Sequence, residues 1–200
     1  MHISDGILTA EVAIGTSIIA LGFLALSFKD LKNKNIAIVS AMAAIFFIAS
    51  FVHIPLGFVQ IHLILTGIIG IILGRQVFLA IFIALLLQGT LLGYGGISSL
   101  GANLIIMSLP AYVIYVASKM GLLNIFSQKV KYFMVGFLAV LLSTLLLALV
   151  LALSKEEYLF ASYTIFLANI PAMFIEGFVT LFLMNYLKRS ISNLLSEAKI

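Results

Sequence analysis

Long runs of apolar residues dominate this sequence and restrict its fold more than any other feature. A helix needs roughly 20 apolar residues to cross the hydrocarbon core of a bilayer. Hydrophobic residues make up 64% of the 200 positions and charged residues only 9%, whereas a soluble domain has about 25% charged residues. The composition therefore predicts a membrane protein and excludes a soluble globular fold.

Seven apolar segments are predicted as transmembrane helices. They cover 7–28, 36–53, 60–74, 76–92, 99–118, 131–153 and 160–187. Only Gly74 and Arg75 separate the third from the fourth, and an alternative fuses these two into one span. We favour the split, because an arginine in the middle of a membrane helix costs about 2.5–3.5 kcal/mol. The predicted fold is all-α and integral to the membrane, with one transmembrane substrate-binding domain over residues 1–200.

The basic residues lie almost entirely in alternate loops between these spans. Ten of the 11 Lys and Arg residues fall on one side, and Lys155 alone falls on the other. Because cytoplasmic loops are enriched in Lys and Arg, we expect the N-terminus outside and the C-terminus in the cytoplasm. The predicted location is the inner (cytoplasmic) membrane, with several passes through the lipid. The positive charge reflects this topology, so no nucleic-acid partner is predicted.

Several polar residues lie near the outer ends of the predicted spans. His2, His53 and His62, the three histidines of the chain, are all expected there, together with Gln88 and Asn103. Polar groups at membrane depth usually face a cavity or one another, which predicts one outward-facing polar pocket. The chain has no cysteine, so a metal ion bound there requires nitrogen or oxygen ligands.

The pair Met1 and His2 offers a specific arrangement for a transition metal. The terminal amine, the amide nitrogen of His2 and its imidazole form fused chelate rings around one ion. We expect this N-terminus to be retained, since no cleavable signal peptide is recognisable. A further imidazole completes a square-planar set of four nitrogens, which favours Ni²⁺ or Cu²⁺. His62 is the first choice for that ligand and His53 the second, although an accidental His2 and interfacial histidines explain the pattern more simply.

Four stretches of the sequence resemble motifs of the CbiM/NikM family. Residues 1–6, Met-His-Ile-Ser-Asp-Gly, resemble the start of its members, and residues 88–103, from Gln-Gly-Thr-Leu-Leu-Gly to Gly-Ala-Asn, resemble its second motif. Residues 62–67 and 171–177 are similar to two shorter elements. Members of this family are the substrate-binding membrane subunits (S components) of energy-coupling-factor (ECF) importers for cobalt and nickel.

The resemblance implies seven transmembrane helices, in which a first helix is added to a six-helix S-component core. It also implies that the Met1 amine, the backbone nitrogen and imidazole of His2, and His62 hold the metal. Asn103 matches a position near the site that orients the ligands. His53 and Gln88 are further candidates for positions around the metal.

The implied function is capture of Co²⁺ or Ni²⁺ on the outer face for ATP-driven uptake, which supplies cobalamin biosynthesis or a nickel enzyme. The subunit is expected to be neither an enzyme nor the carrier of a resident cofactor. No Walker motif occurs in the sequence, so a transmembrane coupling subunit and cytoplasmic ATPases are expected partners, with a small accessory membrane subunit as a further one. Small residues on the second span either dock the coupling subunit or pack internally: Ala37, Ser40, Ala41 and Ala44.

Three alternatives remain open from the residues alone. An S component for an organic micronutrient needs a larger outer cavity and no free N-terminus. A self-sufficient secondary metal transporter normally shows inverted repeats and carboxylates near the midplane; Glu176 is the only such residue, and a structural anchor is favoured over a proton relay there. A membrane metalloenzyme requires a motif such as His-Glu-x-x-His, which the sequence lacks.

Overall fold

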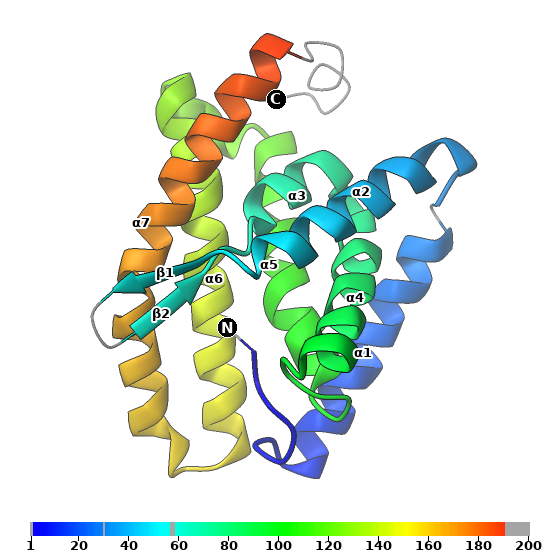
Figure 1. Cartoon of the computed structure of the whole chain (residues 1–200), viewed down its shortest axis with the longest axis vertical. Helices are drawn as coiled ribbons and strands as arrows, with labels where there is room; N and C mark the ends of the chain where they lie inside the picture. The colour runs from blue at the N-terminus through cyan, green and yellow to red at the C-terminus, as the bar shows by residue number, and fades with distance from the viewer. Residues whose placement is uncertain (1, 30, 57–58, 191–200) are drawn as a thin grey trace.

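The computed structural model describes residues 2–29, 31–56 and 59–190, with the backbone alone at residue 34 and in 53–56 and 59–61. Within these residues the chain forms helices and one two-stranded hairpin (Figure 1). The elements are α1 (Ala10–Lys29), α2 (Asn33–Ala49), β1 (His53–Leu56), β2 (Val59–His62), α3 (Thr66–Leu73), α4 (Val77–Leu87), α5 (Leu100–Lys119), α6 (Gln128–Ser154) and α7 (Tyr158–Ser190).

Most helices coincide with the apolar segments of the sequence, since a helix satisfies its backbone hydrogen bonds internally at membrane depth. The spans predicted at 7–28, 99–118, 131–153 and 160–187 correspond to α1, α5, α6 and α7. Together with the stretch Thr66–Leu92, these are five helical segments in the described part of the chain long and apolar enough to cross a membrane. The chain is a multi-pass membrane protein. The helix α2 is shorter than these five.

The third predicted span, 60–74, was wrong as a single helix. Its first residues form strand β2, which pairs with β1 in an antiparallel hairpin, and helix α3 begins only at Thr66. Hydropathy does not distinguish a strand from a helix in a short apolar run. The strand register places His53 directly opposite His62. Non-helical backbone of this kind is tolerated within a membrane protein where protein surrounds it.

Gly74 begins a short 3₁₀ turn, Gly74–Gln76, that links α3 to α4. Its φ of 56° and ψ of −127° lie outside the helical region, and φ in this range favours glycine. A Cβ added at Gly74 would lie 2.9 Å from the Tyr115 ring, so the turn is also packed closely against α5. The α-helical geometry is thus interrupted at Gly74, within the apolar stretch Thr66–Leu92, and the number of crossings here stays a prediction.

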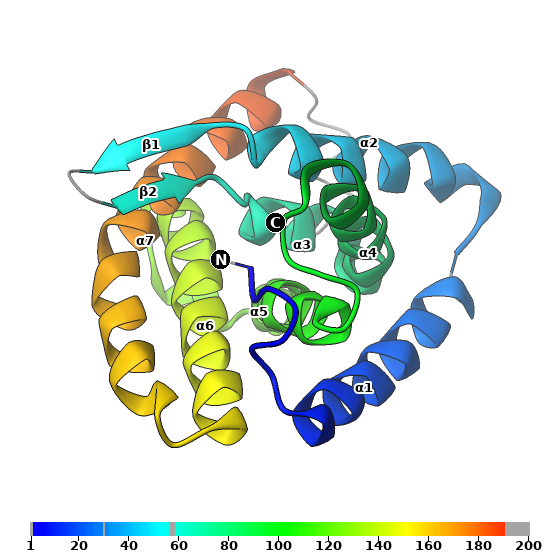
Figure 2. The ribbon, with the colours of Figure 1, turned by 60° about the horizontal axis from the view of Figure 1, so that its bottom comes forward.

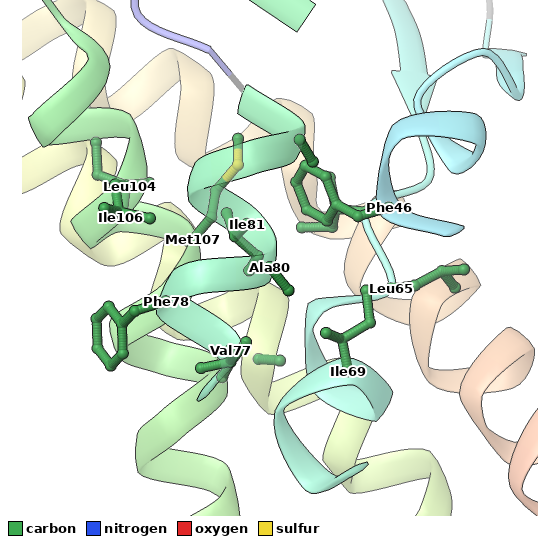
Figure 3. Close-up of a cluster of buried hydrophobic side chains, with 14 of the residues drawn as sticks. Phe46, Leu65, Ile69, Val77, Phe78, Ala80, Ile81, Leu104, Ile106 and Met107 are labelled. Atoms are coloured by element: carbon green, nitrogen blue, oxygen red, sulfur yellow. The ribbon is translucent and has the colours of Figure 1, made fainter. Parts of the chain in front are cut away.

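The core of the protein lies around α3, α4 and α5, which contain many of the buried apolar side chains. Figure 3 shows side chains from these helices and Phe46 of α2 packed together in one cluster. The helices α1 and α7 lie at the periphery and expose large apolar side chains such as Ile18 and Phe182, which are 65% and 72% exposed. Such surfaces are suited to lipid contact, because lipid tails are as apolar as the side chains.

The N-terminal segment before α1 enters this bundle with its first described residues. Seen in Figure 2, the dark-blue segment turns back from the start of α1 and enters the space among α5, α6 and α3. Ile3 in this segment is 2% exposed. The fold therefore buries Ile3 inside the bundle, while Ser4, Asp5 and Gly6 are exposed.

Candidate metal site

Asn103 on the first turn of α5 holds the N-terminal segment by its backbone. The side-chain oxygen of Asn103 accepts a hydrogen bond from Ile3 N at 2.8 Å, and its nitrogen donates to Ile3 O at 2.9 Å. The Ser99 hydroxyl donates to the same Ile3 carbonyl at 2.6 Å. Buried backbone groups need hydrogen-bond partners. The Asn103 amide pairs with both the N–H and the C=O of Ile3, as a neighbouring β-strand would. The adjacent residue, His2, is fixed as a result.

Asp5 attaches the same segment to the loop before α5. Its carboxylate accepts hydrogen bonds from Ile97 N at 3.2 Å, from Ser98 N at 2.9 Å and from the Ser98 hydroxyl. The Ser98 hydroxyl is the main cause that lowers the pKa of Asp5 below its usual value, and the backbone N–H groups add to it. A negative charge is also favoured near the N-terminus of a helix. The ionised carboxylate therefore holds the segment at neutral pH.

The glycines of the loop at 93–96 allow the N-terminal segment to approach this closely. A Cβ added at Gly96 would overlap the carboxylate of Asp5, and one at Gly95 would lie 3.0 Å from the Asn103 side-chain nitrogen. Gly95 also has a φ of 78°, which favours glycine. The loop is thus more than a tight turn, because the absence of side chains at Gly95 and Gly96 leaves room for the N-terminal segment.

The imidazoles of His2 and His62 lie next to each other within this arrangement, with nearly parallel planes. Their ring centroids are 5.2 Å apart and their planes differ by 13°. The ring of Tyr94 lies against His2 as well, with a centroid distance of 6.1 Å. Both ring nitrogens of His2 are buried and have no hydrogen-bond partner among the described residues. A buried polar atom without a partner is costly, so these nitrogens are positioned for a ligand.

The protonation state of His2 suits a ligand that is a cation. Burial, followed by the positive charges of the N-terminus and of His62, lowers the pKa of the His2 imidazole from 6.5 to about 2. The imidazole is therefore neutral at physiological pH. A neutral imidazole keeps the lone pair with which histidine binds transition metals.

Glu176 of α7 supports the segment that follows His62. Its carboxylate accepts hydrogen bonds from Ile64 N and, through both oxygens at 3.2 Å, from Leu65 N. The side chain is 2% exposed, and its partners are backbone groups. Glu176 is therefore a structural anchor, as the sequence favoured, and it joins α7 to the turn between β2 and α3.

The structure brings some of the predicted site residues together and leaves others aside. His2, His62 and Asn103 meet at the end of the N-terminal segment, whereas Met1 and the side chain of His53 lie outside the described residues. Gln88 is fully buried at the start of a π-helical turn, and neither atom of its amide has a hydrogen-bond partner among the described residues. Within the described part of the chain, no group of three or more His, Asp or Glu side chains gathers.

Two residues near the site were not predicted from the sequence. Tyr94, which lies against His2, stands in the glycine loop where an aromatic side chain is a detectable signal. Ser99 precedes α5 and is 1% exposed, but a lone serine in a loop carries no recognisable sign of its contact with Ile3.

Comparison with known proteins identifies the family. The model of the family CbiM, described as cobalt uptake substrate-specific transmembrane region, matches residues 2–194. The chain belongs to the CbiM family. The match extends from the N-terminal segment through α7, so it includes every residue of the candidate site apart from Met1.

Individual relatives of this CbiM-family chain carry names that refer to metal transport. The cobalt transport protein CbiM of Clostridium tetani is 28% identical over 212 residues, which cover 96% of this chain and 87% of that protein. The fused nickel transport protein NikMN of Rhodobacter capsulatus is 32% identical over 114 residues, covering 54% of this chain and 33% of that protein. A Haemophilus influenzae protein named for metal transport is 37% identical over 113 residues, 56% of this chain and 55% of its own length. The chain thus spans about half or less of two of these relatives.

The fold of the CbiM-family chain also matches solved structures. The crystal structure of a transition metal transporter superposes with a TM-score of 0.81 over 98% of this chain and 97% of that one, at 21% identity. At this identity the likeness shows the fold alone.

Proposed function

We propose that this CbiM-family chain is the membrane subunit that captures Co²⁺ or Ni²⁺ on the outer side of the membrane for uptake. The observation that carries the proposal is the buried pair of His2 and His62, in which both nitrogens of His2 lack a partner among the described residues. Neutral imidazole suits both ions. The names of the Clostridium and Rhodobacter relatives, one for cobalt and one for nickel, support this choice of substrates.

The proposed ligands are the Met1 amine, the amide nitrogen and imidazole of His2, and the imidazole of His62. Bonds of about 2 Å from an ion to a ring nitrogen allow two imidazoles on one ion to have centroids up to about 6 Å apart. The separation of 5.2 Å between His2 and His62 falls within this limit. Asn103 holds the backbone next to His2, which restricts the direction in which its amide nitrogen points. His53 remains the second choice, because the register places it opposite His62.

We further propose seven crossings, with the metal site facing outward and the basic ends in the cytoplasm. The ends of α1, α5 and α7 carry Lys29, Lys119 and Lys188 in their last turns. The Ser27 hydroxyl near the end of α1 donates to Arg75 O at 2.8 Å, so α1 ends beside the turn between α3 and α4. The site lies near the opposite ends, where α1 and α5 begin. This distribution agrees with the enrichment of Lys and Arg in cytoplasmic loops.

The energy for uptake is proposed to come from partner proteins, namely a transmembrane coupling subunit and cytoplasmic ATPases, with a small accessory membrane subunit as a third. Support comes from the small residues on α2. Ala37, Ser40, Ala41 and Ala44 are all exposed, so they do not pack inside this chain. Small residues allow close approach of another helix in the membrane, which fits the coupling subunit.

Titration of the purified protein with Ni²⁺ and Co²⁺ tests the ligand set. The first variant carries three residues ahead of Met1 (Gly-Ser-Gly), which removes the terminal amine from the site. An extension by one residue is unsuitable, because a histidine at the third position forms a different chelate with the amine and two amides. The same three residues added after Ile200 serve as the control. We expect the N-terminal extension to abolish tight binding and the C-terminal extension to leave it unchanged.

Replacement of each histidine separates the two choices for the remaining ligand. His62→Ala should lose much of the affinity for Ni²⁺, while His53→Ala retains it. The opposite result would move the ligand to His53. Unchanged binding in the N-terminally extended protein would overturn the chelate, and full binding in all three variants would overturn the proposed site.

A further inference from the structure

The turn between β2 and α3 contains a backbone conformation that is unusual for the residue that adopts it. Only three residues separate His62, the last residue of β2, from Thr66, the first of α3. Leu65, the last of these three, has a φ of 53°. This left-handed conformation is uncommon for a residue other than glycine and asparagine. The surrounding structure must therefore hold it in place.

The Leu65 side chain supplies one part of this support. It is 8% exposed and lies in the apolar cluster near Phe46 and Ile69 (Figure 3). Its carbonyl accepts a hydrogen bond from Ile69 N at 3.1 Å, at the start of α3. The side chain and carbonyl of Leu65 are thus both engaged with the core.

The Glu176 carboxylate supplies the other part. It accepts hydrogen bonds from the N–H groups of Ile64 and Leu65, which are the two residues before α3 begins. These hydrogen bonds give both buried N–H groups a partner. On the other side of the turn, Leu63 N donates to Val52 O at 3.3 Å. The segment after His62 is therefore fixed by partners on two sides.

The position of Glu176 is itself set by close packing of two long helices. A Cβ added at Gly136 of α6 would overlap the carbonyl of Glu176, and one at Gly177 would lie 2.6 Å from the Phe133 ring. The backbones of α6 and α7 are therefore in direct contact at this level. The carboxylate projects from a rigid element toward the turn.

We propose that Glu176 is the positioning residue for His62: by fixing the N–H groups of residues 64 and 65, it keeps the imidazole at stacking distance from His2. This inference rests on the proposed function, in which His62 binds the metal. The carboxylate does not touch the ion and acts through the backbone of the turn. Its role is thus to preorganise one ligand of the set.

The test compares Ni²⁺ affinity and the visible absorption spectrum of the Ni²⁺ complex among variants of the full chain. Glu176→Ala should lower the affinity about 10- to 100-fold and give the spectrum of His62→Ala, because the imidazole leaves the ion in both. Glu176→Gln keeps an acceptor oxygen and should lose less. The double variant should bind no more weakly than His62→Ala, since both changes remove the same ligand.

A matched control separates positioning from a general disturbance of α7. Thr180 lies one turn further along the helix, is fully buried, and its hydroxyl has no hydrogen-bond partner among the described residues. Thr180→Val should therefore keep the wild-type affinity and spectrum. If Glu176→Ala does not fold, Glu176→Gln tests the inference instead. A positioning role then requires that the spectrum of its Ni²⁺ complex shifts measurably toward the spectrum of His62→Ala.

Three outcomes are informative. A wild-type spectrum in every Glu176 variant that folds, with an altered one in His62→Ala, would overturn the inference and leave the proposed function intact. Losses that multiply in the double variant would show that Glu176 acts independently of His62 and would also overturn it. Wild-type binding in His62→Ala would instead overturn the proposed ligand set.

Discussion

The imidazole ring of His2 lies parallel to that of His62, with centroids 5.2 Å apart, although 60 positions separate the two residues in the chain. Each ring reaches this place through a different support. Asn103 holds the backbone that follows His2, and Glu176 holds the backbone that follows His62. The pair therefore depends on α5 and α7 as much as on the two histidines themselves.

Loss of the Asn103 amide should weaken metal binding and the fold together. Asn103→Ala leaves the buried N–H of Ile3 without its partner, which costs about 1–3 kcal/mol, and lets His2 move. We expect a fall in Ni²⁺ affinity of about 10- to 100-fold, measured by titration, and a lower unfolding temperature. Asn169→Ala is the control, because the Asn169 amide donates to Ile165 O within its own helix. Equal affinities in the two variants would contradict the role of Asn103.

A methyl group at Gly96 should displace the N-terminal segment. The added Cβ of Gly96→Ala would overlap the Asp5 carboxylate, so the hydrogen bonds to Ser98 cannot form as they do now. The expected result is weaker Ni²⁺ binding with an intact helical circular dichroism spectrum. Gly89→Ala provides the comparison, since a Cβ there lies 3.7 Å from the carbonyl of Tyr94, an ordinary contact. Similar affinities for the two variants would show that the close approach of Asp5 is unimportant.

The aromatic ring of Tyr94 should contribute moderately to the affinity. Stacked rings stabilise each other by about 0.5–1.5 kcal/mol beyond the area that they bury, which corresponds to a change of about 2- to 12-fold in affinity. Tyr94→Ala should lose this amount in a Ni²⁺ titration, whereas Tyr94→Phe retains the ring and should bind as the wild type does. A loss in both variants would assign the effect to the hydroxyl.

The stability of the metal-free protein should fall as the pH drops below about 6.5. The pKa of His2 is lowered to about 2 in the folded protein, while an unfolded chain has the ordinary value of about 6.5. Between these values the unfolded state binds more protons, so acid favours unfolding by up to about 1.4 kcal/mol per pH unit. Thermal unfolding between pH 7 and 4.5 measures this slope. His2→Phe, which keeps a ring without a titrating nitrogen, should have a shallower slope, and equal slopes would contradict the assignment.

The sequence predicted α1, α5, α6 and α7 closely, because a long apolar run in a membrane favours a helix, which satisfies its own backbone hydrogen bonds. The segments at 99–118 and 131–153 became α5 and α6 with nearly the same ends. The segment at 60–74 failed because hydropathy carries no information on backbone conformation. In the folded protein its first part pairs with β1, a contact that depends on tertiary structure.

The site was predictable only in part. The sequence predicted that His2 and His62 lie close together, because both are expected at the outer ends of the spans and both belong to family motifs. The structure brings the two rings together. The roles of Met1, His2 and His62 as metal ligands stay predictions, as does the choice between His62 and His53. The specific bonds that Asn103 and Glu176 make to backbone groups were beyond sequence reasoning, because any buried backbone group is a chemically equivalent partner. Only the folded chain shows which of them lies within reach.

The entry of the N-terminal segment into the bundle also has a consequence for biogenesis. Ile3 precedes its partner Asn103 by 100 positions, so the ribosome makes the segment long before the loop and helix that hold it exist. It can take its place only after the loop before α5 and the start of α5 have been made. One of the earliest parts of the chain to be synthesised is thus one of the last to be seated.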